Sequence, residues 1–184
     1  MKRILDRLLW AVSGTTLVVY PFLVWFGWNR LPARTLGALL ALLLGVRFLG
    51  FGRKSHELAP AALIPLVPVL LGTAFGESRL FLWYPALVSG STLVWFAASL
   101  RGRPAVERFA RLRHPELPPE AVRHCRDATW AWVIFLAINT SMAAVTALRG
   151  DLNLWTIWNG AVFYSGMGLM FSGEYAVRRL RGVR

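Results

Sequence analysis

Long runs of uncharged residues, separated by short charged segments, divide the chain along its whole length. Five such runs hold between 19 and 22 residues each. About 20 apolar residues in a helix cover the hydrocarbon core of a bilayer, because each residue rises about 1.5 Å. Each run therefore predicts one membrane-spanning helix. The runs are Leu8 to Asn29, Leu58 to Gly76, Leu80 to Leu100, Ala128 to Leu148 and Leu152 to Gly173.

A sixth run, from Thr35 to Gly52, is interrupted only by Arg47. This arginine lies near one end of the run, so its flexible side chain can extend to the membrane interface. We therefore expect an all-α polytopic membrane bundle, a single domain over residues 1–184, with a basic cytoplasmic loop over residues 101–127. Its six transmembrane helices are predicted over about 8–29, 35–52, 58–76, 80–100, 128–148 and 152–173.

The basic N-terminus followed by an apolar run is also the pattern of a secretory signal peptide. This run, however, is longer than the apolar part of such peptides, and the bulky Trp25 and Trp28 stand where a cleavage site needs small residues. We expect the segment to be retained as the first span, with a kink at Pro21.

Composition agrees with a membrane protein, since 56% of the residues are hydrophobic and only 16% are charged. Soluble domains average about 25% charged residues. The net charge of +12 could indicate a nucleic-acid partner, but its distribution gives another reason for it. With the N-terminus inside, 16 of the 21 Lys and Arg residues lie on the cytoplasmic side, and Arg30, Arg34, Arg79 and Arg149 lie on the other. The positive-inside rule then predicts that both termini are cytoplasmic. The basic excess is thus explained by topology, and we expect no nucleic-acid partner.

The predicted inner loop combines seven arginines with a short apolar repeat. Val106, Phe109 and Leu112 recur every three residues, which is typical of a short helix lying on the inner leaflet. Its arginines would meet anionic lipid headgroups or a cytoplasmic partner. The alternative is a solvated connector whose charges serve only the topology. The seven arginines are Arg101, Arg103, Arg108, Arg111, Arg113, Arg123 and Arg126.

Three polar residues within or at the ends of the spans are candidates for intramembrane contacts. Arg47 and Glu174 lie at the cytoplasmic ends of the second and sixth spans and could pair, which would offset their desolvation. The alternative is that Arg47 extends to the interface and that Glu174 only marks the membrane edge. Asn139 lies in the middle of the fifth span and needs a partner there. A helix contact is favoured over a substrate site for Asn139.

Small residues and prolines indicate how the spans pack. Asn139, Ala143 and Ala147 share one face of the fifth span, and Gly37, Ala41 and Gly45 share one face of the second. Three prolines, Pro60, Pro65 and Pro68, predict a kinked or unwound third span. Broken helices line the sites of many transporters, so this span is the candidate wall of a cavity.

The sequence predicts no catalytic residues, no metal site and no cofactor. It shows no nucleophile with a base, no pair of carboxylates within a span and no phosphate-binding loop. A single cysteine, Cys125, excludes an internal disulfide framework. The histidines His56, His114 and His124 lie in two different loops without the spacing of metal ligands.

Four short segments follow one another in a recognisable order over roughly residues 37–180. They are Val46-Arg47-Phe48 with Glu57, Arg103 to Phe109, Arg126 to Phe135 with Asn139, and Leu154 to Gly160. In this order they resemble the bacterial intracellular septation protein A family or a divergent sister group of inner-membrane proteins. The resemblance implies a multi-pass inner-membrane protein that acts in cell-envelope maintenance and septation, with division proteins as partners and no catalytic residues.

The leading hypothesis is therefore a non-enzymatic membrane protein that supports envelope synthesis, maintenance or septation through protein and lipid contacts. Anionic inner-leaflet lipids, envelope or division proteins and a second copy of the chain are its candidate partners. The alternative is a small transporter or lipid-handling protein with a cavity near the proline-rich third span. A cleft that reaches Asn139 would favour this alternative.

Overall fold

The computed structural model describes residues 19–51, 64–112 and 114–180, with only the backbone for residues 46–51 and 180. Every regular element within these residues is helical, as the sequence predicts. A first helix covers residues 19–27. It is followed by α2 (Ala33–Phe51), α4 (Leu66–Phe75), the 3₁₀ helix η2 (Ser78–Trp83), α5 (Tyr84–Ser99), α6 (Ala105–Arg111), α7 (Pro119–Arg149), α8 (Leu152–Thr156), the π-helix η3 (Ile157–Val162) and α9 (Phe163–Leu180).

Prolines and glycines set most of the helix boundaries. Pro65 precedes α4, and Pro119 is the first residue of α7, a position where the missing N–H costs nothing. Two helices end at glycines with positive φ, at 73° for Gly76 and 69° for Gly150, a conformation that other residues adopt only with strain. Asp151 then caps α8, because its carboxylate accepts hydrogen bonds from two backbone N–H groups.

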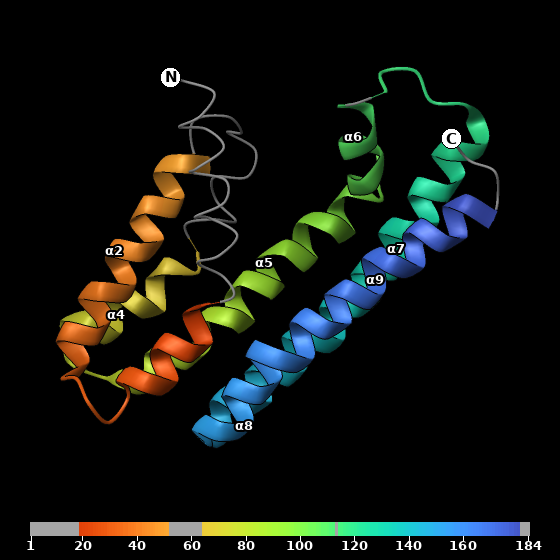
Figure 1. Ribbon diagram of the computed structural model, residues 1–184. Coiled ribbons are helices and arrows are strands. Elements are labelled where there is room, and N and C mark those ends of the chain that lie inside the picture. Colours follow the sequence, from red (N-terminus) through yellow and green to blue (C-terminus); the bar gives the residue numbers. More distant parts are fainter. Residues whose placement is uncertain (1–18, 52–63, 113, 181–184) are drawn as a thin grey trace, which may run out of the picture.

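The helices form two groups on either side of α5. Helices α2 and α4 pack together on one side, and α7 and α9 run side by side on the other (Figure 1). Helix α5 packs along α7, and the short α6 lies near the ends of α5 and α7 (Figure 1). The end of α5, the short α6 and the start of α7 thus lie at the same end of the bundle (Figure 1).

The buried core is concentrated around η2. Tyr20, Phe81 and Trp155 are among its largest fully buried side chains. The Tyr20 hydroxyl donates a hydrogen bond to the Phe81 carbonyl, and the Trp155 indole donates one to the Leu82 carbonyl, both at 2.9 Å. The first helix, η2 and α8 are therefore joined by side chains that bond to the backbone of η2.

The exterior of the described helices is rich in large apolar side chains. Leu42, Phe75, Leu148 and Leu169 each expose more than two thirds of their surface. Two helical segments, Ser78–Ser99 and Pro119–Arg149, are long and apolar enough to cross a membrane. Large exposed apolar side chains thus lie both on these two segments and on α2, α4 and α9.

Several helix boundaries differ from the predicted spans. The fourth predicted span begins in a 3₁₀ helix, and the described part of the third is helical only from Leu66. Helix α7 begins at Pro119, nine residues before the predicted fifth span, because the apolar run alone does not mark the start of a helix. The predicted loop 101–127 is therefore helical at Ala105–Arg111 and again from Pro119.

Candidate functional site

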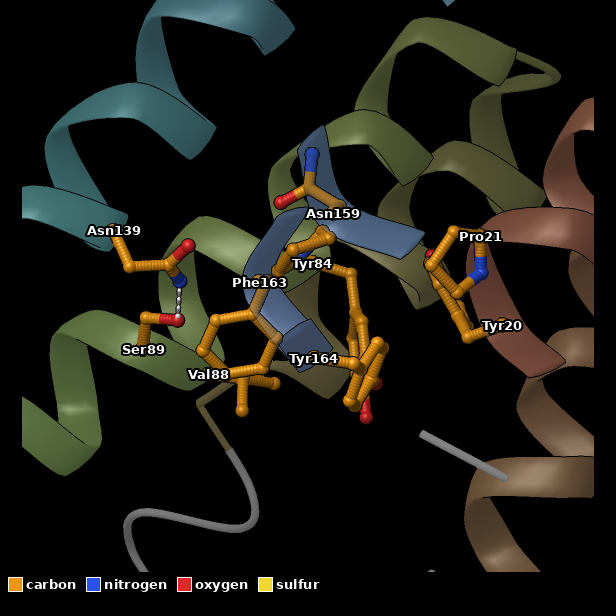
Figure 2. A pocket seen from close by; sticks show the side chains of 10 residues that line it. Tyr20, Pro21, Tyr84, Val88, Ser89, Asn139, Asn159, Phe163 and Tyr164 are labelled. Atoms are coloured by element: carbon orange, nitrogen blue, oxygen red, sulfur yellow. Dashed lines mark hydrogen bonds between the residues drawn. The ribbon is translucent and has the colours of Figure 1, made fainter. Parts of the chain in front are cut away.

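Asn139 lies at the centre of a hydrogen-bonded contact between three helices. Its amide donates to the Ser89 hydroxyl of α5 at 2.7 Å (Figure 2). Its carbonyl oxygen accepts from the Trp158 indole of η3 at 3.2 Å. Only 3% of Asn139 is exposed, so the two bonds satisfy a polar side chain that the apolar surroundings would otherwise penalise.

A small cavity of about 30 Å³ adjoins this contact (Figure 2). Asn159 also faces it, and its side-chain oxygen is buried without a hydrogen-bond partner among the described residues. The Asn159 amide donates to the Trp155 carbonyl at 2.9 Å, within the π-helical turn that begins at Ile157. The cavity is lined by Tyr20, Pro21, Tyr84, Pro85, Val88, Ser89, Asn139, Asn159, Phe163 and Tyr164.

The size and lining of this cavity limit its chemistry. About 30 Å³ accommodates one or two water molecules, since one water needs about 10–15 Å³ of such space. No charged side chain of the described residues lines it. A water that donates to the Asn159 oxygen is the occupant that the cavity fits, and a lipid or an organic substrate does not fit it.

We predict that Asn139 and Ser89 are energetically coupled. In a double-mutant cycle of Asn139→Ala and Ser89→Ala, the coupling energy should be about 1 kcal/mol, the range found for hydrogen bonds between membrane helices. Unfolding in mixed detergent, followed by circular dichroism, measures it. Ser141→Ala is the matched control, since Ser141 bonds only to the Ala137 carbonyl of its own helix in the described structure. Strict additivity of Asn139→Ala and Ser89→Ala would contradict the contact.

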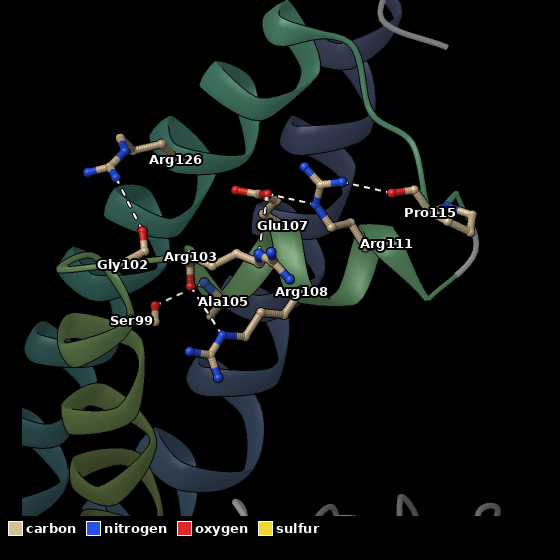
Figure 3. A network of polar contacts seen from close by, with 9 residues as sticks. All are labelled: Ser99, Gly102, Arg103, Ala105, Glu107, Arg108, Arg111, Pro115 and Arg126. Carbon is tan, nitrogen blue, oxygen red and sulfur yellow. Dashed lines mark hydrogen bonds and ion pairs between the residues drawn. The ribbon is translucent and has the colours of Figure 1, made fainter.

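The predicted basic loop is an ordered structure attached to the ends of α5 and α7. The first two N–H groups of α6 donate to hydroxyls, Ala105 to Ser99 at 2.9 Å and Val106 to Thr129 at 3.3 Å. Arg126 donates to the carbonyls of Leu100 and Gly102. Figure 3 shows two of these contacts, between Ala105 and Ser99 and between Arg126 and Gly102. The position of α6 is thereby fixed.

A buried carboxylate organises the arginines around α6. Glu107 is only 5% exposed, and its carboxylate lies 2.7 Å from Arg111 and 3.9 Å from Arg103 (Figure 3). Arg111 also donates to the Pro115 carbonyl, and Arg108 to the Arg103 carbonyl. Arg111 and Arg126 thus hold the loop in place, a role that the sequence analysis did not assign to them.

The surface around α6 is both basic and apolar. Phe109 is 49% and Leu112 81% exposed, whereas Val106 is half-buried. Arg101, Arg103, Arg108, Arg123 and Arg126 are exposed, and Arg113 lies outside the described residues. We refer to the surface formed by Phe109, Leu112 and the five exposed arginines as the basic platform.

Aromatic rings connect this platform to the helices behind it. Phe109 lies 5.8 Å from Trp95 of α5, which lies 5.3 Å from Phe96, measured between ring centres. Phe96 lies 6.3 Å from Trp132 of α7, and Trp132 lies 5.0 Å from Phe171 of α9. The row crosses four helices at the end of the bundle that the charge pattern assigns to the cytoplasm.

Cys125 lies among these elements, just before the apolar run that begins at Ala128. Burial raises the pKa of its thiol, and the negative charges of Glu107 and Glu174 raise it further. The positive charges of Arg178 and Arg111 act in the opposite direction. At neutral pH the thiol is therefore protonated, and it is a poor nucleophile.

The structure does not bring all predicted site residues together. Figure 1 places α2, which carries Arg47, and α9, which carries Glu174, on opposite sides of α5. The Arg47 side chain and Pro60 lie outside the described residues, so a pair of Arg47 with Glu174 stays a prediction. Pro65 precedes α4 and Pro68 is buried in its first turn. The cavity beside Asn139 is lined by other residues.

The described residues contain no group of three or more His, Cys, Asp or Glu side chains that could hold a metal ion. Comparison of the chain with protein-family models, with curated proteins and with solved structures found no match. The geometry of these sites and the pattern of the sequence are thus the basis for a functional hypothesis.

Proposed function

We propose that the chain is a six-span, non-enzymatic protein of the bacterial inner membrane that supports envelope synthesis or septation by binding anionic lipids and membrane proteins. The observation that carries this proposal is the basic platform, whose exposed arginines and apolar Phe109 and Leu112 lie on α6 and on the chain beside it, which hydrogen bonds hold against the ends of α5 and α7. Such a combination binds membrane surfaces, because apolar side chains insert while arginines meet anionic headgroups. The ordered motifs that resemble septation protein A support the envelope role.

The exterior supports the six-span arrangement. Two helices are long and apolar enough to cross a membrane, and shorter apolar helices lie at Ala33–Gly45 and Leu66–Phe75. The described residues of every other predicted span also contain helix. Large apolar side chains on the outside and the satisfied Asn139 inside are the distribution that a bilayer favours.

The fixed position of α6 supports a binding role over a solvated connector. Glu107 is buried beneath the platform and pairs with Arg111. Its negative charge is therefore neutralised inside the protein and does not repel an anionic lipid at the surface. Each exposed arginine near an anionic leaflet contributes about 1 kcal/mol. A connector that served only the topology would need neither a buried ion pair nor exposed apolar residues.

Neutralising four exposed arginines of the platform should weaken its contact with anionic lipid at least about tenfold, because each contributes about 1 kcal/mol. The test variant carries Arg101→Gln, Arg103→Gln, Arg108→Gln and Arg123→Gln. A photo-crosslinking residue at Leu112, which is 81% exposed, reports phosphatidylglycerol and protein partners in native membranes.

The matched control changes four arginines of the predicted opposite face, namely Arg30, Arg34, Arg79 and Arg149, also to glutamine. This control should leave the products at Leu112 unchanged. If the platform variant and the control yielded the same lipids and the same proteins, the platform would not be the binding surface.

A second candidate function, a small transporter, is favoured by one observation. The cavity beside Asn139 adjoins a π-helical turn, and such turns occur often at functional sites. At about 30 Å³ the cavity would have to widen before it could take any solute larger than water. If vesicles reconstituted with the protein took up a solute, and if Asn159→Leu abolished this uptake, transport would be favoured over a binding role of the basic platform.

A further inference from the structure

A larger cavity, of about 270 Å³, lies between α7 and α9. This volume is close to the lower end of the about 300–1,000 Å³ that small-molecule sites occupy. The cavity is separate from the small cavity beside Asn139, and no residue of the basic platform lines it. Its polar side chains are His124, Asp127 and Glu174, and its largest apolar ones are Trp132, Leu169 and Met170.

The polar end of the cavity contains an unsatisfied group. His124 is only 5% exposed, and neither of its ring nitrogens has a hydrogen-bond partner among the described residues. A buried ring without partners destabilises the fold, so a ligand that bonds to it gains free energy. The carboxylates of Asp127 and Glu174 line the same cavity and make it attractive to a cation.

The kind of cation follows from the geometry of the three side chains. They do not form a metal-binding group, since no group of that kind exists in the described part of the chain. A primary ammonium bonds to acceptors about 2.7–2.9 Å from its nitrogen, whereas metal–ligand bonds are about 2.0–2.6 Å long, so its acceptors can stand further apart than the ligands of a metal ion. It has three hydrogens, and three side chains with acceptor atoms line the cavity.

The position of the cavity indicates where this ammonium comes from. Its residues on α7 surround Ala128, where the uncharged run begins, and those on α9 surround Gly173, where the last uncharged run ends. The cavity therefore lies at the expected boundary between membrane and cytoplasm. Trp132 and Leu169 lie within the uncharged runs, and Leu169 is 74% exposed, so an apolar residue of the lining is accessible in the part of the bundle expected to face lipid.

We propose that this cavity binds the primary-ammonium headgroup of an inner-leaflet phospholipid, the ammonium contacting His124, Asp127 and Glu174. The glycerol backbone and the upper part of the acyl chains lie against Trp132, Leu169 and Met170. Arg178 lies one helical turn after Glu174. It is exposed and is placed to meet the phosphate of the same headgroup.

The site distinguishes headgroups by their hydrogen-bond donors. A choline headgroup carries a positive charge but no N–H, so it leaves the acceptor nitrogen of the buried His124 ring without a donor. A glycerol headgroup has no positive charge for the two carboxylates. The site therefore selects ethanolamine, whereas the basic platform selects negative charge, and either inference can fail without the other.

The experiment measures lipids retained by the purified full chain in detergent, by native mass spectrometry. Equimolar phosphatidylethanolamine, phosphatidylcholine and phosphatidylglycerol are offered together. Retention of phosphatidylethanolamine should exceed that of phosphatidylcholine at least about tenfold, because hydrogen bonds to charged groups contribute enough for this factor. Asp127→Asn with Glu174→Gln should abolish the preference. Glu116→Gln with Glu120→Gln, which changes two exposed carboxylates outside the cavity, should retain it.

Ala131→Phe provides a second variant that removes no polar group. Ala131 is an exposed residue of the lining, so a phenyl ring there fills the cavity while α7 remains folded, which circular dichroism verifies. Loss of the preference in this variant supports the site. Equal retention of ethanolamine and choline lipids overturns the proposal, as does preferential retention of phosphatidylglycerol. If free ethanolamine at the same concentration as phosphatidylethanolamine displaced the lipid completely, the ligand of the cavity would be the free amine and not a lipid headgroup.

Discussion

Replacing Gly37 with alanine should lower the free energy of unfolding by about 1–3 kcal/mol, the usual cost of overpacking. Gly37 is buried where α2 meets α4, and a Cβ atom there would overlap the Thr73 hydroxyl and lie 2.9 Å from the Phe81 ring. The Thr73 hydroxyl donates to the Val69 carbonyl at 2.6 Å, so it cannot move away without breaking a hydrogen bond. Leucine at position 37 should cost more, because its branches extend into the same contact.

Gly45 provides the matched control on the same helix. A Cβ at Gly45 meets nothing within 4 Å among the described residues, so Gly45→Ala should stabilise the protein by up to about 1 kcal/mol through helix propensity alone. Unfolding in mixed detergent, followed by circular dichroism, measures both variants. The free energy of unfolding should fall in Gly37→Ala and rise in Gly45→Ala. Equal changes at the two positions would show that α2 does not approach α4 closely at Gly37.

The packing of single helices could largely be predicted from the sequence. The repeat of Asn139, Ala143 and Ala147 predicts a contact face, and these residues are 3%, 0% and 8% exposed. The repeat of Gly37 and Gly45 on α2 predicts a contact face less well. Gly37 lies close to Thr73 of α4, whereas no described residue lies within 4 Å of a Cβ at Gly45. Periodicity identifies residues that share a face, but the length over which a partner helix stays in contact depends on tertiary geometry.

The contacts between distant segments could not be predicted. The Tyr20 hydroxyl bonds to a carbonyl 61 residues away, in a segment that reads as the plain continuation of an apolar run. The Phe81 carbonyl also accepts the backbone N–H of Tyr84, so the Tyr20 hydroxyl uses the second acceptor position of the same oxygen. No residue type in the sequence marks a carbonyl that will accept such a second bond.

The arrangement of residues around α6 and the start of α7 could be predicted only in part. The exposed arginines and the apolar repeat of the platform were identified from the sequence, whereas the burial of Glu107 was not. The position of His124 in a loop was inferred from the start of the apolar run at Ala128. Pro119 followed by Glu120 is a typical beginning of a helix, and it would have placed His124, Asp127 and Ala131 on one helical face.

Trp155→Ala should lower the free energy of unfolding by about 3–5 kcal/mol, the largest effect that we expect from a single substitution. The ring is fully buried in the core around η2, and it lies 6.5 Å from Tyr20, measured between ring centres. Truncation leaves a cavity and also removes the donor to the Leu82 carbonyl. Both losses occur where the first helix, η2 and α8 meet. The group of α2 and α4 should therefore separate from the group of α7 and α9 at a lower concentration of the denaturing detergent.

Trp155→Phe separates the two contributions, because phenylalanine keeps most of the ring but donates no hydrogen bond. It should cost about 1–3 kcal/mol, the penalty of a buried acceptor left without a partner. Trp130→Ala is the matched control, since Trp130 is 52% exposed, and its effect should stay within about 0.5 kcal/mol. If Trp155→Ala and Trp130→Ala destabilised the protein equally, the indole of Trp155 would not hold the core together, and the contact between α8 and η2 would be incidental to the fold.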